Sequence, residues 1–215
     1  MNLTLGDTRL IIAACKKEGL LRNQAAYVLA TAYHETAHTM KPVREYGGET
    51  YLKKKAYYPY VGMGYVQLTW LANYQKASKK LGVDFVKNPR LLLKAEYAAP
   101  ILVIGSRDGW FTGKKLSDYI DDNTMLLVSP PRPKIDFINA RRIINGTDKA
   151  ALIAGYAKTY ADLLKAEGYG NTPPSQVDNA VREMMAEKKK SIEPAKGASF
   201  WAQLITAILR YFSKG

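Results

Sequence analysis

The stretch NQAAYVLATAYHETAHTM (residues 23–40) decides the fold, because it begins as a helix suited to burial. Its small and apolar side chains recur at helical spacing, namely Ala26, Leu29, Ala30 and Tyr33. Asn23 can cap the start of this helix with its side-chain oxygen. Glu35 follows near the C-terminal end. The pattern therefore predicts a carboxylate at the point where a buried helix reaches the edge of the core.

Helical periodicity also dominates the sequence on either side of this stretch. A shorter helix is predicted over residues 7–19, and others over 66–81, within 88–111 and over 148–168. The last should turn five side chains inward: Leu152, Tyr156, Tyr160, Leu163 and Leu164. Residues 42–65 are rich in Gly, Pro and Tyr and predict a loop with at most a small β-hairpin. We therefore expect a mainly α domain over residues 1–170.

Composition limits the classes of protein that the chain can belong to. Its 215 residues are 47% hydrophobic and 24% charged, as in ordinary globular proteins. The single cysteine, Cys15, excludes an intramolecular disulfide. No secretion signal is evident, and no apolar run reaches the roughly 18 residues of a membrane-spanning helix. The net charge of +13 predicts attraction to polyanions. No nucleic-acid recognition motif accompanies that charge, so we expect no nucleic-acid partner.

The composition changes after residue 170. Residues 171–198 predict a charged helix and a linker, and residues 199–215 predict an amphipathic helix with one narrow polar stripe. Two interpretations of the terminal helix stay open. It either docks on the body of the protein or contacts an anionic membrane or lipopolysaccharide, and we favour the second.

His34, Glu35 and His38 form the pattern HExxH, which is typical of zinc metallopeptidases. On a helix, the two histidines would lie on one face and bind the metal. A catalytic zinc needs a third protein ligand, and these are the only two histidines in the chain. A carboxylate such as Glu45, Glu49 or Glu96 would have to supply that ligand, and a pattern with three fixed positions also arises by chance. We therefore expect no metal and no cofactor, and keep the zinc peptidase as an alternative.

Paired carboxylates offer a second interpretation of Glu35. Inverting glycoside hydrolysis uses one carboxylic acid and one carboxylate base, roughly 6.5–9.5 Å apart. Glu45 and Glu49 in the following loop are both candidates for the base. Burial of Glu35 beside apolar groups would favour its protonated form, as a general acid requires.

Four blocks of sequence together resemble glycoside hydrolase family 19, in its bacteriophage and prophage endolysin branch. The blocks are AYHETAHTMKPVRE (32–45), YYPYVGMGYVQLTWLANYQKAS (57–78), RDGWFTGKKLSDY (107–119) and DFINARRIINGTDKA (136–150). The resemblance implies a lysozyme-like, two-lobed helical domain with a central cleft and an inverting mechanism without metal. His38 and Met63 stand where the family has Gly and Arg, so subsite preference is open.

The resemblance also implies roles for individual residues. Glu35 matches the general acid and Glu45 the general base, with Glu49 as the rival base. Thr69 matches the hydroxyl residue that positions water. We expect the remaining matched or adjacent polar and aromatic residues to bind substrate: His34, Tyr58, Tyr60, Gln67, Asn73, Arg141, Arg142 and Asn145. Either Arg141 or Arg142 could pair with a glutamate.

These expectations point to a monomeric endolysin with lysozyme (muramidase) activity on peptidoglycan. It would be made in the host cytoplasm and would reach the cell wall once a separate phage protein opens the inner membrane. The high positive charge favours anionic peptidoglycan as the partner. Because chitin shares the β-1,4-linked N-acetylglucosamine unit, a chitinase remains the alternative glycosidase.

Overall fold

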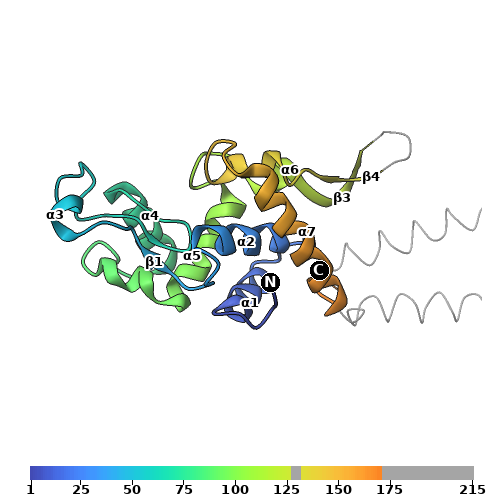
Figure 1. Ribbon diagram of the computed structural model, residues 1–215, viewed down its shortest axis with the longest axis horizontal. Helices are drawn as coiled ribbons and strands as arrows, with labels where there is room; N and C mark the ends of the chain where they lie inside the picture. Colours follow the sequence, from blue (N-terminus) through green and yellow to red (C-terminus); the bar gives the residue numbers. More distant parts are fainter. Residues whose placement is uncertain (127–131, 171–215) are drawn as a thin grey trace, which may run out of the picture. The chain divides into compact units, whose positions relative to one another are not determined.

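A computed structural model describes residues 1–126 and 132–170 (Figure 1). The chain divides into two units, Met1–Gly170 and Asn171–Gly215. The segments predicted over 171–198 and 199–215 lie outside the described residues. None of the helices that the structure describes has the length and apolarity needed to cross a bilayer.

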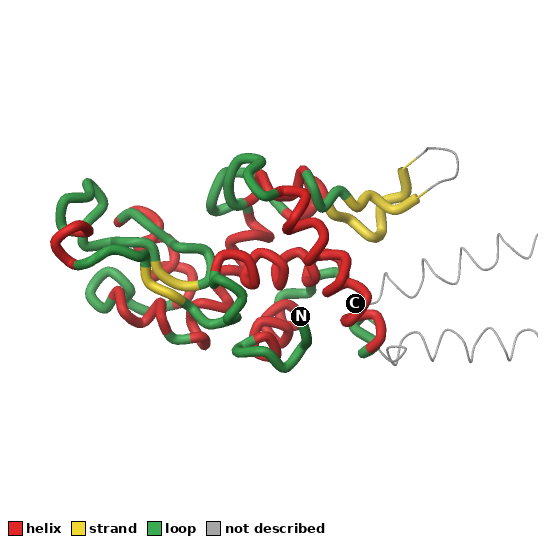
Figure 2. The backbone as a smooth tube through the Cα atoms, in the orientation of Figure 1, coloured by secondary structure: helices red, strands yellow, loops and turns green. Residues whose placement is uncertain are grey.

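The described part of the chain is mainly α, as predicted (Figure 2). Its α-helices are α1 (Thr8–Lys17), α2 (Arg22–Glu35), α3 (Glu49–Leu52), α4 (Leu71–Leu81), α5 (Ala95–Asp108), α6 (Leu116–Tyr119) and α7 (Ala150–Ala166). Two 3-10 helices, η1 (Pro89–Leu93) and η2 (Asn139–Ile143), and the strands β1 (Val43–Arg44), β2 (Met63–Gly64), β3 (Ile120–Leu126) and β4 (Arg132–Ile135) complete it.

Helix α2 lies in the middle of the larger hydrophobic core, packed against α1, α5 and α7 (Figure 1). Every residue from Ala25 to Ala32 is buried. A helix that is apolar on all sides must be covered all round, and its alanines let the neighbouring backbones approach closely. The same core holds Cys15, which is fully buried. Burial raises the pKa of the Cys15 thiol far above its ordinary value.

The predicted Asn23 cap of α2 is wrong. The N-cap is Leu21, whose backbone N–H donates to the side chain of Gln24 at 3.1 Å. Asn23 lies inside the first turn and donates from Nδ2 to Asp122 at 2.9 Å. The Asn23 side chain, which local pattern predicts as the helix cap, therefore binds a residue 99 positions away in the sequence.

Helix α2 ends at Glu35 in a turn that reverses the chain direction. The Thr36 hydroxyl donates to the carbonyl of Ala32 at 2.7 Å and accepts from the backbone N–H of Met40 at 3.0 Å. Ala37 and His38 take left-handed conformations, with φ of 48° and 69°. The N–H of His38 donates to the carbonyl of Tyr33 at 2.8 Å, which closes the helix end. His38 therefore does not continue the helix that carries His34.

A second, smaller core gathers residues between 52 and 101. Its buried members are Leu52, Val61, Met63, Leu68, Tyr74, Ala77, Phe85, Leu92 and Ile101. Helix α5 belongs to both cores, because Ile101 packs in this one while Leu102 and Val103 pack in the larger. Pro100 lies inside α5, which runs without interruption from Ala95 to Asp108.

Two small antiparallel sheets are present among the described residues, one more than expected (Figure 2). Strands β1 and β2 pair Val43 with Gly64 and Arg44 with Met63 within 42–65. Helix α3 lies in the connection between them, so this is a small antiparallel sheet rather than the expected short hairpin. Strands β3 and β4 form the unexpected sheet. Its first residues include Asp121, Asp122 and Asn123, types depleted in strands, so sequence pattern favours a turn there and backbone pairing overrides it.

Two predicted helix features need correction. The helix predicted from residue 66 begins at Leu71, because Leu68 instead pairs with Met63 through two backbone hydrogen bonds. On α7, Leu152 is 46% exposed rather than inward. The buried face of α7 consists of Ala150, Ile153, Ala154, Ala157, Tyr160 and Leu164.

Candidate active site

Glu35 forms an ion pair with Arg141 at the end of α2. Arg141 Nη1 donates to Glu35 Oε1 at 2.7 Å, and Arg141 Nε donates to the carbonyl of Asp148 at 3.1 Å. The Arg141 side chain is 4% exposed and that of Glu35 is 21% exposed. A buried guanidinium needs such partners, because an unpaired charge there would be costly. Two predicted site residues, 106 positions apart in sequence, thus come together.

This pair changes the expected surroundings of Glu35. The sequence predicted apolar neighbours that favour the protonated acid, whereas the closest partner is a cation. Arg141, rather than Arg142, is that partner, because Arg141 turns into the core from η2 while Arg142 is exposed. The guanidinium of Arg141 therefore gives the Glu35 carboxylate a charge-assisted hydrogen bond.

The two histidines do not form the helical pair that an HExxH zinc site requires. His38 follows the helix end, and its ring stacks on Tyr33 with centroids 4.3 Å apart. Its Nε2 lies 3.3 Å from the Tyr156 hydroxyl. Burial lowers the pKa of His34 and outweighs the opposing effect of the nearby Glu35 carboxylate. Within residues 1–126 and 132–170, no three His, Cys, Asp or Glu residues are grouped to hold a metal ion.

Glu45 is held by two neutral donors just after strand β1. The Tyr57 hydroxyl donates to Oε1 at 2.6 Å, and the Gly62 backbone N–H donates to Oε2 at 2.9 Å. The hydrogen bond to Glu45 raises the pKa of Tyr57 to about 12, because a phenolate could not donate to the carboxylate. Both oxygens of Glu45 therefore act as acceptors, as those of an ionised carboxylate do.

Glu49, the rival base, lies closer to solvent. Its side chain is 53% exposed and pairs with Arg44 Nη2 at 2.7 Å. The Tyr58 hydroxyl donates to Glu49 at 3.1 Å. Arg44, and after it Tyr58, lower the pKa of Glu49, and this bond raises the pKa of Tyr58. Tyr58 thus contacts a predicted carboxylate, but a different one from Tyr57.

Gln67, Thr69 and Asn73 brace the loop beside Glu45. Gln67 Nε2 donates to the carbonyl of Val43 at 2.9 Å, two residues before Glu45. The Thr69 hydroxyl donates to the carbonyl of Gln67 at 2.7 Å, and Asn73 Nδ2 donates to the carbonyl of Thr69 at 2.7 Å. These side chains hold the backbone between β2 and α4, and the Thr69 oxygen keeps lone pairs for another donor.

The other predicted site residues lie apart from these contacts. Tyr60 packs edge-on against Tyr74, with centroids 5.2 Å apart. Asn145 is exposed, and its Oδ1 accepts from the Gly146 N–H at 2.8 Å. Arg142 is exposed, and its carbonyl accepts from the Thr112 hydroxyl at 2.6 Å.

Trp70 is an unusual residue that the sequence interpretation overlooked. Its backbone has φ 78° and ψ 140°, a combination that essentially only glycine adopts freely. Strain of this kind costs about 1–3 kcal/mol and is concentrated at functional sites. Trp70 is 52% exposed, and its ring lies 5.3 Å from that of Tyr57 at an interplanar angle of 71°. The only sequence feature that could have pointed to Trp70 as a site residue is its position directly after Thr69.

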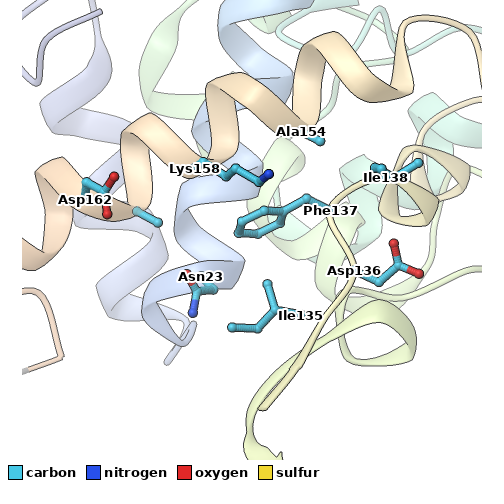
Figure 3. Close-up of a pocket in the computed structure, with 9 residues that line it drawn as sticks. Asn23, Ile135, Asp136, Phe137, Ile138, Ala154, Lys158 and Asp162 are labelled. Atoms are coloured by element: carbon cyan, nitrogen blue, oxygen red, sulfur yellow. The ribbon is translucent and has the colours of Figure 1, made fainter. Parts of the chain in front are cut away.

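A separate pocket of about 520 Å³ lies on another part of Met1–Gly170 (Figure 3). Its lining includes Phe137 between β4 and η2, Asn23 near the start of α2, and Lys158 and Asp162 of α7. No residue of the predicted site lines this pocket. It therefore adds nothing to the chemistry of the two glutamates.

Positive charge is concentrated in the stretch that carries Glu45. Residues 41–115 contain 14 Lys and Arg against 5 Asp and Glu, a net charge of +9. Residues 1–40 and 116–170 together contain 11 against 10, a net charge of +1. Most of the excess charge of the chain therefore accompanies the smaller core.

No family model matches this chain, and no curated protein matches it.

Proposed function

We propose that the chain is a glycoside hydrolase of the phage endolysin type, which cleaves β-1,4 glycosidic bonds of peptidoglycan by inversion. The observation that carries the proposal is the pair of partly buried glutamates from different elements, each held in place by its own donors. Glu35 is fixed by Arg141, and Glu45 by Tyr57 and Gly62. In this proposal the domain has the two-lobed, lysozyme-like arrangement, with the substrate between the two cores.

Glu35 is the general acid and Glu45 the general base of the proposed reaction. In this proposal Glu35 takes up a proton from solvent before each turnover and gives it to the glycosidic oxygen, and the carboxylate that results regains its ion pair with Arg141. Glu45 takes a proton from a water molecule that attacks the opposite face of the sugar. The Thr69 oxygen helps to orient this water, and the hydrogen bonds around Gln67 hold Thr69 in place.

Peptidoglycan is the preferred substrate because of the charge distribution. Its glycan strands carry carboxylates, on the muramic acid side chains and peptides, that neutral chitin lacks. A net charge of +9 over residues 41–115 attracts such a polymer. The proposal includes a monomeric protein made in the host cytoplasm and acting on the cell wall after the inner membrane is opened.

The test is to treat purified peptidoglycan with the protein, with and without EDTA, and to measure new reducing ends and new amines. We expect reducing ends without new amines, unaffected by the chelator. Neutral N-acetylglucosamine oligomers provide the chitinase arm of the experiment. Chelator-sensitive release of amines would contradict the glycosidase and restore the peptidase alternative.

Glu35→Gln should lower the rate of reducing-end release by about 10³-fold, within the range for loss of a general acid. The matched control is Glu167→Gln on the exposed Arg9–Glu167 pair, which should leave the rate unchanged. Equal rates for Glu35→Gln and the wild type would remove Glu35 from the mechanism.

A further inference from the structure

The indole of Trp70 is half exposed, and the backbone that carries it has a strained conformation. The Trp70 N–H donates to the carbonyl of Tyr60 at 3.0 Å, and the Trp70 carbonyl accepts from the N–H groups of Asn73 and Tyr74. Gln67, three residues earlier, also has positive φ, at 53°. These hydrogen bonds fix the segment between β2 and α4 in its strained conformation. A glycine would adopt it without strain, yet the chain has its largest side chain type there.

A second ring fixes the orientation of the first. Tyr57 meets Trp70 edge to face, and its hydroxyl is bound to Glu45 at 2.6 Å. Tyr57 therefore contacts the indole with its ring and the proposed base with its oxygen. Because both ends of Tyr57 are held, this tyrosine links the exposed indole of Trp70 to the Glu45 carboxylate and fixes their relative position.

From this arrangement we infer that Trp70 and Tyr57 form an aromatic platform that binds one pyranose ring of the glycan strand beside Glu45. This inference rests on the proposed function and names a binding subsite within it. The C–H face of a pyranose packs on an indole, and its hydroxyl groups remain free to bind neighbouring polar groups. A tryptophan that served only to pack the protein interior would be covered by other side chains. Trp70 is instead half exposed, which leaves its ring free to contact a sugar.

Fluorescence gives a readout of the platform that does not depend on hydrolysis. The chain has three tryptophans, and replacing Trp110 and Trp201 by Phe leaves Trp70 as the only one. The probes are the tetramer of β-1,4-linked N-acetylglucosamine and peptide-free glycan strands, added to a Glu35→Gln background. We expect a saturable change in Trp70 emission with either probe. Unchanged emission over the range in which calorimetry detects binding would overturn the inference.

The decisive variant is Trp70→Gly in the otherwise native chain, because it should separate folding from binding. Glycine relieves the backbone strain, so the thermal midpoint should stay equal or rise, while Kd for the tetramer and KM for peptidoglycan increase at least tenfold. Trp70→Phe should recover most of the affinity. The matched control is Leu71→Ala, which removes an adjacent side chain of 40% exposure and should change Kd less than twofold. Unchanged Kd and KM in Trp70→Gly would overturn the platform.

The outcomes separate this inference from the proposed function. Reducing-end release by the wild type together with an unchanged KM in Trp70→Gly would remove the platform and keep the hydrolase. Saturable binding to Trp70 without any reducing-end release by the wild type would remove the hydrolase and keep a glycan-binding platform. Absence of both would reject both proposals.

Discussion

Residues 41–115 and the remainder of Met1–Gly170 hold their glutamates in opposite ways. The first stretch has a net charge of +9, yet Glu45 is bound by a hydroxyl and a backbone N–H. The remainder has a net charge of +1, yet Glu35 is bound by Arg141, the only buried charged residue in the described part of the chain. Local contacts therefore decide the surroundings of each carboxylate, and the excess surface charge remains available for long-range attraction.

The largest expected effect is on the rate of peptidoglycan hydrolysis. It tests whether Glu45 or Glu49, both in the basic stretch 41–115, is the proposed general base. Glu45→Gln should lower reducing-end release by about 10²–10⁴-fold, because it removes the proposed general base. Glu49→Gln, the matched change at the exposed glutamate, should alter the rate by less than about threefold, since exposed ion pairs contribute little. Steady-state assays on peptidoglycan measure both. The reverse order of effects would assign the base to Glu49.

The next effect is on stability and concerns the less charged part. Arg141→Met should lower the free energy of unfolding by about 3–5 kcal/mol, because it leaves Glu35 partly buried without its cation. Arg142→Met changes the neighbouring exposed arginine and should stay within about 0.5 kcal/mol. Urea denaturation followed by circular dichroism measures both variants. Similar losses in the two would show that the Glu35 pair does not contribute to folding.

A smaller effect should distinguish the two regions by their charge. Replacing Lys53, Lys54 and Lys55 by Gln removes three charges from the basic stretch and should weaken binding to peptidoglycan several-fold at low salt. The control replaces Lys17, Lys149 and Lys165 outside it. Sedimentation with insoluble peptidoglycan at 20 and 300 mM salt measures the binding. An equal loss in both triple variants would show that only total charge matters.

The smallest effect concerns one proton on Glu49. Arg44 and Tyr58 lower the pKa of Glu49, so its carboxyl should titrate below the ordinary glutamate range. Any stability from this pair is present above that range and is lost as pH falls through the lowered pKa. Arg44→Gln should return the titration toward the ordinary value, as measured by carbon NMR of the side-chain carboxyl. An unchanged midpoint would mean that Arg44 does not pair with Glu49 in solution.

Sequence pattern predicted the mainly α fold and the buried helix with Glu35 near its C-terminal end, because both follow from local periodicity. It did not distinguish Arg141 from Arg142, since adjacent arginines differ only in which one turns toward the core. It also extended a helix over residues 66–70, where Gln67 and Trp70 have positive φ. Nothing in those residue types demands that conformation, which accompanies the backbone hydrogen bonds of Leu68 with Met63 and of Trp70 with Tyr60.

The predictions for Asn23 as a helix cap and for Leu152 as an inward-facing residue were wrong for a related reason. Asn23 is a good cap by type, but Asp122, 99 residues later, binds its side chain. Leu152 fits the apolar period of α7, but the neighbours of that helix cover a different face. The partners of Glu35 and Glu45 likewise come from other elements. The family resemblance offered Arg141 or Arg142 as a partner for a glutamate, but neither resemblance nor spacing predicted that Tyr57 and Gly62 donate to Glu45.

The single thiol of the chain, Cys15, is hidden in the larger core and poorly ionised. A thiol in that state reacts slowly with maleimides and with oxidants. The native chain therefore already behaves as a cysteine-free background for site-directed labelling. One cysteine placed on α3 and another on α7 would accept a pair of fluorophores without any change to Cys15, and would report whether the distance between these two helices changes when glycan is added.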